Sequence, residues 1–373
     1  MDETNSKTKQ ALEGASAQGR SRRILELDAL RGLAALAVVL YHYTTRYEFK
    51  VGHTSAPAFS VPFGHYGVEL FFLLSGFVIF MTLQRTKRAR DFVISRFSRL
   101  YPGFWVGMAV TLAAIGMMGL PFAGYSIGAK DILVNAAMLQ RYVPGTRFVD
   151  GAYWTLCVEL TFYGWIFMLF LSGHLKRVRL AIAALVGLEL ALHFVTNGGD
   201  ITAPFPLRAL RQVALAHFGP YFGAGILFYQ LRNRAPGSSA SGDFFGILAC
   251  LVAVALMRPM PDFIASVVCF GIFALLVGGK LSFLASRPLL FLGAISYSLY
   301  VVHQNVGFLL LRHAEAAGMN PNLAILLATA VSLAIATAIT FLVERPALQG
   351  IRRLTTRSTP VAQTGIKPAP LST

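Results

Sequence analysis

Two residues capable of chemistry stand in the apolar run LDALRGLAALAVVLYHY, residues 27–43. Arg31 and His42 are eleven positions apart, and eleven helical steps of about 100° return the chain to within about 20° of one direction. A helix would therefore carry both on one face, about 16 Å apart along its axis. Arginine is a fixed cation suited to phosphate, and histidine, with an unperturbed pKa near 6.5, is the usual general base. The pair predicts a site for an anionic donor and an activated hydroxyl; an interfacial anchor plus a buried structural histidine is the alternative.

A second pair of cations lies in SRFSRLYP, residues 95–102. Arg96 and Arg99 are three positions apart, so both lie on one face of a helix. Two guanidiniums at this spacing could clamp a phosphate. The alternative is that they belong to the general excess of basic residues expected beside a membrane.

Acidic and aromatic residues form a third group. Glu69 and Glu159 lie in apolar stretches, where an ionisable side chain is costly and requires a partner. His42 and Arg31 are the candidate partners, and either acid could orient the imidazole as the third member of a catalytic relay does. The isolated Glu189 is expected to be structural.

Tyr297, Tyr300 and His303 follow one another at intervals of three in ISYSLYVVHQ. Their polar tips predict a lined cavity, and a packed aromatic stripe is the alternative.

The composition places these residues in a membrane. Of 373 residues, 55% are apolar and 13% are charged, whereas a soluble chain carries about 25% charged residues. A chain with so little charge cannot cover a soluble surface, which also excludes a soluble nucleic-acid binder.

Ten stretches approach the roughly 20 apolar residues that a spanning helix needs. They are 27–46, 66–84, 101–120, 151–172, 178–196, 211–231, 243–257, 262–279, 289–311 and 322–344. Runs of this length are typical of helices and not of barrel strands. We therefore expect an all-α polytopic bundle of about ten transmembrane helices.

The distribution of lysine and arginine predicts its orientation. If the N-terminus is cytoplasmic, 23 of the 33 basic residues fall on the cytoplasmic side and nine on the other, in agreement with the positive-inside rule. Both termini are then cytoplasmic, and the net charge of +16 reflects topology, so nucleic acid is not expected as a partner. We expect a disordered cytoplasmic tail at 1–23 and a transmembrane domain at 24–346. A second cytoplasmic tail without regular structure, basic and then rich in Pro, Ser and Thr, is expected at 347–373.

The three cysteines, Cys157, Cys250 and Cys269, have neither the spacing of a disulfide framework nor that of a zinc site. No metal-binding cluster or nucleotide-binding loop is evident. We expect no metal and no tightly bound cofactor.

Six motifs in order resemble the acyltransferase 3 family of bacterial integral-membrane O-acyltransferases. They are LDALRGLAALAVVLYH, GVELFFLLSGFVI, SRFSRLYP, WTLCVE, ISYSLYVVH and FLVERP, the last at 341–346. The resemblance implies transfer of an acyl group, usually acetyl, from cytoplasmic acyl-CoA as co-substrate to a hydroxyl of an extracytoplasmic carbohydrate or glycolipid. The location it implies is the bacterial cytoplasmic (inner) membrane.

The resemblance also assigns roles to residues. It places the essential arginine and histidine of the family at Arg31 and His42, and its paired arginines at Arg96 and Arg99. It therefore implies a donor site at Arg31, Arg96 and Arg99. The acid of the second-helix motif falls on Glu69, where relatives often have Asp. Trp154 and Glu159 match the fourth-helix motif, whereas Cys157 stands where relatives often have Ser. The C-terminal motif falls on Glu344, Arg345 and Pro346.

The sequence thus predicts three groups of site residues. The catalytic group is His42 as general base with Glu69 and Glu159, the donor-binding group is Arg31, Arg96 and Arg99, and the cavity-lining group is Trp154, Tyr297, Tyr300 and His303. A transporter or flippase of an anionic lipid or glycan, with the charged residues as a proton relay, is the rival function. A small-molecule acceptor, such as a macrolide antibiotic or a lipid, is the rival acceptor. The sequence leaves the acceptor, the acyl length and the oligomeric state open.

Overall fold

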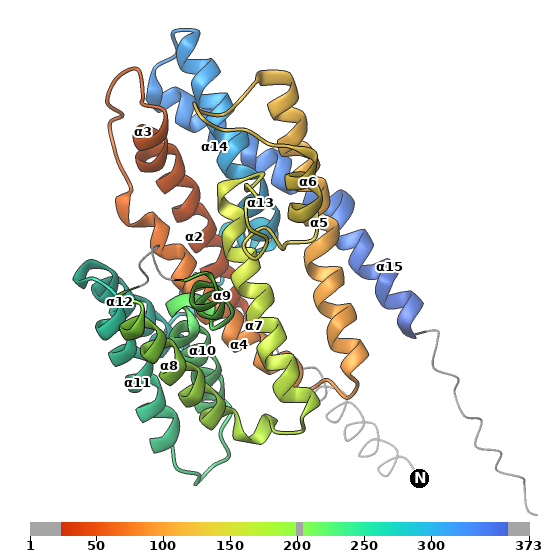
Figure 1. The fold of residues 1–373 in the computed structure, drawn as a ribbon. Coiled ribbons are helices and arrows are strands. Elements are labelled where there is room, and N and C mark those ends of the chain that lie inside the picture. Colours follow the sequence, from red (N-terminus) through yellow and green to blue (C-terminus); the bar gives the residue numbers. More distant parts are fainter. Residues whose placement is uncertain (1–23, 199–203, 357–373) are drawn as a thin grey trace, which may run out of the picture.

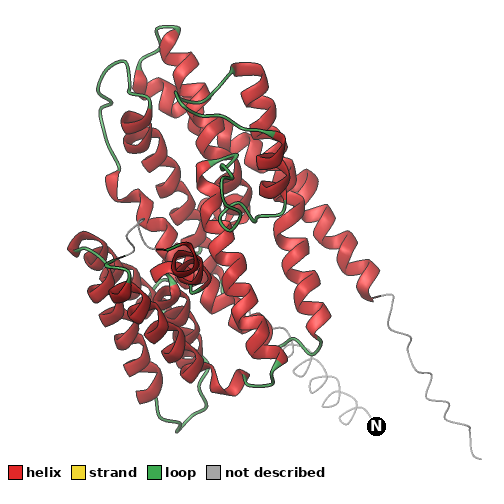
Figure 2. Cartoon of the chain, in the orientation of Figure 1, coloured by secondary structure: helices red, strands yellow, loops and turns green. Residues whose placement is uncertain are grey.

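The computed structural model describes residues 24–198 and 204–356. This part of the chain consists of helices and connecting loops and contains no strand (Figure 2). The expected all-α architecture is therefore confirmed. The expected tail at 1–23 and the last part of the C-terminal tail lie outside the described residues.

Ten helices lie where the ten spans are predicted (Figure 1). They are α2 (Leu25–Tyr41), α4 (Gly67–Leu83), α5 (Ala89–Met118), α7 (Trp154–Leu171), α8 (Val178–Val195), α10 (Gly219–Arg232), α11 (Ser241–Met257), α12 (Met260–Val277), α13 (Arg287–Ala316) and α14 (Pro321–Ile339). Shorter helices are α3 (Tyr47–Lys50), α6 (Ala129–Ala136), α9 (Phe205–Val213) and α15 (Arg345–Thr356). Figure 1 shows α8, α10, α11 and α12 on one side of the molecule and α5 and α15 on the other, with α4 and α7 between them.

Seven helical segments of the described chain are long and apolar enough to cross a membrane. They are Pro62–Leu83, Ala89–Met118, Gly151–Leu171, Leu175–Val195, Met260–Val277, Arg287–Ala316 and Pro321–Ile351. The apolar α11 is shorter, α2 has 17 residues and α10 has 14. The chain is a multi-pass membrane protein, while the count of ten spans and the cytoplasmic termini stay predictions.

The segment predicted as one helix over 211–231 is broken. Helix α9 ends at Val213 and α10 begins at Gly219. Between them Leu215, Ala216 and His217 have φ angles of +65°, +49° and +75°. Left-handed backbone costs a residue with a side chain about 1–2 kcal/mol, so surrounding contacts must hold this turn. None of the three residues is glycine, so the sequence does not signal their left-handed backbone. The following Gly219-Pro220 is a dipeptide typical of turns, and the predicted helix overlooked it.

Two π-helical turns extend the predicted helices. The turn His42–Arg46 joins α2 to α3, and the turn Thr340–Glu344 joins α14 to α15. Such turns are rare and frequently lie at functional sites. Helix α15 continues to Thr356, so the expectation of an unstructured tail after Pro346 is wrong for residues 347–356. Pro346 follows the π-helical turn within one continuous helical path, so its missing N–H interrupts the ladder of backbone hydrogen bonds at this point.

Glycines let the central helices touch through their backbones. A Cβ on Gly32 of α2 would lie 2.6 Å from the backbone nitrogen of Gly293 on α13, and a Cβ on Gly293 would collide with the Asp28 carbonyl oxygen. Ten residues further along both helices, His42 lies against His303. The two helices are therefore parallel and in close contact, as small residues allow in membranes.

Helix α4 is held in the same way on both of its sides. Gly67, at its first residue, would place a Cβ 2.6 Å from the Ala34 carbonyl oxygen of α2. Gly76 abuts the backbone of Phe222 on α10, and Gly225 of α10 abuts the backbone of Leu73. The order α13, α2, α4, α10 is thus fixed by backbone contacts.

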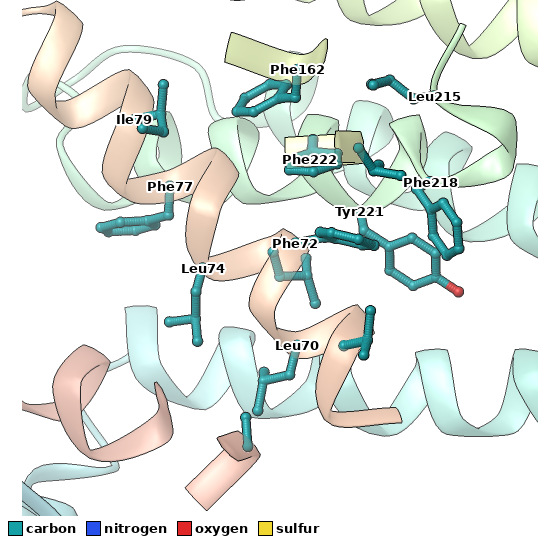
Figure 3. Packing of buried hydrophobic residues seen from close by; sticks show 14 of the residues in the cluster. Leu70, Phe72, Leu74, Phe77, Ile79, Phe162, Leu215, Phe218, Tyr221 and Phe222 are labelled. Atoms are coloured by element: carbon teal, nitrogen blue, oxygen red, sulfur yellow. The ribbon is translucent and has the colours of Figure 1, made fainter. Parts of the chain in front are cut away.

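Aromatic side chains fill the space between α4, α7 and α10 (Figure 3). The rings of Phe162 and Phe222 stack with centres 4.2 Å apart, and the Phe72 ring lies 4.7 Å from Phe222 and 5.0 Å from Phe218. Tyr221 is fully buried beside them. Rings of this size pack best in such offset and edge contacts.

We predict that Gly293→Ala destabilises the protein because the added Cβ meets backbone, which cannot rotate away. Overpacking of this kind costs about 1–3 kcal/mol, measured as a lower melting temperature of the purified protein in detergent. Gly271→Ala on α12 is the matched control, because a Cβ there meets nothing within 4 Å. Equal melting temperatures for the two variants would contradict the backbone contact.

Candidate functional site

A cavity of about 120 Å³ lies between α2, α4, α5, α7 and α13. This volume holds several water molecules. Six predicted site residues line it, namely Arg31, Arg96, Arg99, Glu159, Tyr297 and Tyr300. Residues separated by up to 269 positions in the sequence therefore share one polar cavity inside an apolar bundle.

The three cavity arginines differ in their partners. Arg99 forms an ion pair with Glu344, a buried residue at the end of the second π-helical turn. Glu344 also accepts a hydrogen bond from Ser298 at 3.1 Å. Arg31 and Arg96 form no ion pair with any residue of the described chain, and the Arg96 side chain donates only to the Ser95 hydroxyl. Two guanidiniums are thus available to an anion in the cavity.

Glu159 is hydrogen-bonded to hydroxyl groups. Its Oε1 accepts from Ser75 at 2.7 Å and from Tyr163 at 2.6 Å, and all three residues line the cavity. Tyr163 is four positions after Glu159, so helical spacing could have revealed this pair. Ser75 comes from a different helix, and the sequence does not indicate its contact with Glu159.

His42 and His303 form a second centre just beyond the cavity. Their ring centres are 4.7 Å apart, and Nε2 of His303 is 3.2 Å from Nδ1 of His42. His303 is fully buried. Its backbone carbonyl accepts a hydrogen bond from Tyr43, which fixes the position of this turn of α13 against α2.

The hydrogen bonds assign the proton on each ring. Nδ1 of His303 is 2.8 Å from the Tyr300 carbonyl, which can only accept, so this nitrogen carries the proton of the neutral ring. Nε2 of His303 is then an acceptor. Nδ1 of His42 faces this acceptor and the Val38 carbonyl at 2.9 Å, so it too carries a proton. Nε2 of His42 then carries the lone pair, which is the state a general base requires. The side chain of Gln304 also hydrogen-bonds to this imidazole.

Tyr300 separates the cavity from the histidine pair. Its ring is 5.8 Å from Phe71 on the cavity wall and 5.5 Å from the ring of His303. Its hydroxyl accepts from Thr155 at 2.8 Å and donates to the Ala152 carbonyl at 3.2 Å. One aromatic side chain therefore stands between the arginines and His42.

The predicted partners of the two acids are wrong. Neither His42 nor Arg31 pairs with a carboxylate among the described residues. Glu69 lies 3.4 Å from Arg258 on the far side of α4, and Glu159 is satisfied by hydroxyls. The sequence pointed to His42 and Arg31 because it does not show that the segment between α11 and α12 brings Arg258 to the first turn of α4.

Trp154 and His303 do not line the cavity. Successive intervals of three on a helix each rotate by −60°, so His303 points about 120° away from Tyr297 and meets α2. The ring of Trp154 lies against Phe218, 5.3 Å away, and beneath the Arg141 guanidinium. Cys157 is buried and its Sγ contacts the Tyr153 carbonyl at 3.7 Å, so it too lies outside the cavity.

Asp150 is a buried acid that the sequence pattern placed in an outer loop. Its carboxylate accepts from the backbone N–H of Ala152 at 2.9 Å and of Asn305 at 2.8 Å. It therefore ties the start of α7 to α13 two residues beyond His303. No group of three or more His, Cys, Asp or Glu residues in the described chain is arranged to hold a metal ion.

Comparison with known proteins gives one family match. The model of the family described as acyltransferase domain matches residues 24–341. This range contains the residues that line the cavity and the histidine pair, and Glu344 lies just beyond it. The solved structures offer no significant match.

Three curated relatives are similar over different shares of the chain. Nodulation protein 10 of Rhizobium leguminosarum bv. viciae is 31% identical over 52% of this chain and 57% of its own length, which is less than two thirds of that protein. The putative membrane-bound transacylase BcsY of Komagataeibacter xylinus is 26% identical over 77% of this chain and 76% of its own. The exopolysaccharide production protein ExoZ of Rhizobium meliloti is 25% identical over 77% of this chain and 90% of its own.

Because Arg99 forms an ion pair and Arg96 forms none with a described residue, we predict that replacing them changes the stability of the protein to different extents. Arg99→Gln leaves the buried carboxylate of Glu344 without its cation and should lower the free energy of unfolding by about 3 kcal/mol. Arg96→Gln removes no ion pair and should change it by less than about 0.5 kcal/mol.

Thermal and denaturant unfolding in detergent would measure both effects. The double variant Arg99→Gln/Glu344→Gln should recover more than half of the loss because it leaves no unpaired charge. If Arg96→Gln and Arg99→Gln lower the free energy of unfolding equally, the ion pair between Arg99 and Glu344 does not contribute to stability as predicted.

Proposed function

This chain belongs to the acyltransferase domain family, and from this premise we propose that it moves an acyl group from cytoplasmic acyl-CoA to an acceptor hydroxyl outside the membrane. The acyl group is acetyl, a small one, in keeping with the cavity of about 120 Å³. The acceptor is a carbohydrate or glycolipid. The observation that carries the proposal is the succession of two arginines without an ion pair in the described chain, a cavity, and a histidine whose Nε2 carries the lone pair.

The donor side of the proposal depends on charge. Acyl-CoA brings phosphates, and guanidiniums bind phosphate through paired hydrogen bonds. Arg31 and Arg96 form no ion pair with a carboxylate at 24–198 or 204–356, whereas Arg99 pairs with Glu344 and supports the same cavity wall. With the N-terminus in the cytoplasm, the start of α2 and the start of α5 lie on the cytoplasmic side, from which the donor would enter.

The catalytic step follows from the protonation of His42. Nε2 of His42 takes the proton of the acceptor hydroxyl as its oxygen attacks the thioester carbonyl. The carbon–sulfur bond breaks, and the departing thiolate receives that proton from His42. The products are the ester and CoA with a free thiol. The Val38 carbonyl and His303 hold the imidazole with Nδ1 protonated throughout.

Transfer also requires Tyr300 to move. In the structure its ring closes the cavity toward the histidine pair, held by Thr155 and the Ala152 carbonyl. A thioester reaching His42 would displace this ring.

The name of one relative supports the nature of the acceptor, because ExoZ is named for exopolysaccharide production. A polysaccharide or its lipid-linked precursor presents hydroxyls at the outer surface of the membrane, which agrees with the proposed direction of transfer.

We predict that His42→Ala abolishes transfer, lowering kcat at least about 100-fold, because general bases contribute about 10²–10⁴. The assay uses protein in vesicles with radiolabelled acetyl-CoA and a mixture of acceptor glycans and lipids. His174→Ala, at an exposed histidine in the loop before α8, is the control.

If the His42→Ala variant transfers acetyl as fast as the wild type, His42 is not the general base, although the protein is still an acyltransferase. Movement of glycan or lipid across the vesicle membrane without consumption of acetyl-CoA would instead favour a transporter.

We predict that His303→Ala lowers kcat about 10–100-fold with little change in KM for the donor, because His303 positions His42 and does not touch the phosphates. His303→Gln, which keeps an acceptor atom near Nδ1 of His42, should recover part of the loss. The kcat and KM values of the same vesicle assay check this. A rise in KM alone would place His303 in donor binding.

A further inference from the structure

A second basic cluster lies on the side of α4 away from the cavity arginines. Arg258, between α11 and α12, donates to Nε2 of His217 at 2.8 Å. On the other side of this imidazole, Nδ1 lies 3.4 Å from Nη2 of Arg211 on α9. Arg141, from the segment before α7, lies over the Trp154 ring at 6.0 Å. Four separate segments therefore bring three guanidiniums and an imidazole together.

Aromatic rings form the floor of this cluster. Phe218 lies 4.5 Å from the His217 ring and 5.3 Å from Trp154, and the Arg258 guanidinium lies 5.8 Å above it. Flat aromatic surfaces flanked by arginines can bind the apolar face of a sugar ring and its charged substituents together.

Only one of the three guanidiniums is neutralised. Arg258 pairs with Asp262 at 2.6 Å and lies 3.4 Å from Glu69. Arg211 donates to the Gly198 carbonyl at 3.0 Å and forms no ion pair with a described residue. The Arg141 guanidinium has no hydrogen bond within the described chain, and its Nε is buried without a partner.

The remaining carboxylate of the cluster is used by the backbone. Glu189 accepts a hydrogen bond from the N–H of Gly219 at 3.0 Å, next to the left-handed turn at 215–217. It is buried, and it holds in place the turn that presents His217. Residues in such strained conformations persist where surrounding contacts fix them and often lie at functional sites.

The segment that carries Arg141 is anchored by Asp131. The backbone N–H groups of Arg147 and Gly128 donate to its carboxylate at 2.8 and 2.9 Å. These donors hold the pKa of Asp131 below its usual range. The carboxylate is therefore ionised at neutral pH, and its contribution to this fold is lost only as the pH falls through that lowered pKa.

The cluster is close to both parts of the proposed active site. Gly64 packs on α2 at Ala37 and Tyr41, and Gly67 packs on it at Ala34 and Val38. The start of α4, where Arg258 reaches Glu69, therefore lies beside the part of α2 that leads to His42. Trp154 precedes Thr155, whose hydroxyl holds Tyr300 at the end of the cavity. A molecule bound over Trp154 would therefore lie beside the route to His42, on the side opposite to the donor.

We propose that Arg141 and Arg211, with Trp154 as a platform, bind the oxyanion of an acidic sugar residue in the acceptor. The inference rests on the proposed function and specifies its acceptor: a glycan that carries a carboxylate or a phosphate. Neither guanidinium forms an ion pair with a described residue, and the nearby Glu189 carboxylate acts on Arg211 only through its charge. A bound anion would supply a direct partner to both, whereas a neutral sugar would not.

Equilibrium dialysis of the full-length protein in detergent at low salt tests this. The radiolabelled probes are glucose, glucuronate and glucose 1-phosphate, which share one ring and differ in charge. We expect the charged sugars to bind about tenfold more tightly than glucose or better, and Arg141→Gln to remove about that factor, which corresponds to one charge-assisted hydrogen-bond pair.

Arg208→Gln is the matched control, because Arg208 is exposed on the same short helix as Arg211. It should leave binding unchanged, and Arg141→Lys should retain most of the preference for charged sugars, which separates loss of charge from loss of folding. Binding of glucuronate alone identifies a carboxylate acceptor and binding of glucose 1-phosphate alone a phosphorylated one. Equal binding of all three sugars, or equal losses in Arg141→Gln and Arg208→Gln, would overturn the inference.

Parallel acetyl-transfer measurements distinguish this inference from the proposed function. If charged sugars bind through Arg141 but the protein transfers no acetyl group, the anion site is supported and the proposed enzyme activity is contradicted. If the protein transfers acetyl but its Arg141→Gln variant binds charged sugars as the wild type does, the enzyme activity is supported and the anion site is contradicted.

Discussion

The contact between Gly32 and Gly293 brings α2 and α13 together at a distance that no larger residue allows. Because the helices are parallel, this single contact also sets what meets further along them. Ten residues beyond it, His42 reaches His303. Near the contact itself, Arg31 and Tyr297 face the same cavity. A shift of one residue between the helices would rotate each partner by about 100° and separate both pairs, so the geometry of the site depends on this packing.

Burial then determines how the histidine pair is protonated. Inside the bundle each polar group needs a partner, because water is not present to supply one. The carbonyls of Tyr300 and Val38 take the Nδ1 protons of His303 and His42. In a serine hydrolase a carboxylate orients the imidazole, whereas here a neutral histidine and a carbonyl do so without placing an additional charge in the membrane.

The two basic clusters share one arrangement. In each cluster one arginine forms an ion pair with a carboxylate and so has a structural part. Arg99 pairs with Glu344, and Arg258 pairs with Asp262. The other arginines of each cluster have no carboxylate partner in the described chain. A charge without a counterion is costly in a low-dielectric environment, so an anionic ligand stabilises each cluster. The clusters lie on different sides of α4, which suits a reaction in which donor and acceptor approach from different sides.

The sequence by itself determined the membrane class, the approximate positions of ten helices and the residues that gather at the cavity. It could do so because apolar length and ionisable residues within apolar runs are local signals. Only the tertiary structure decided the partners. Glu69 meets Arg258, Glu159 meets Ser75 and His42 meets His303 because helices distant in sequence are brought together by glycine contacts that no local pattern specifies. The break at 214–218 escaped prediction for the same reason, since buried contacts such as those of Glu189 hold that turn.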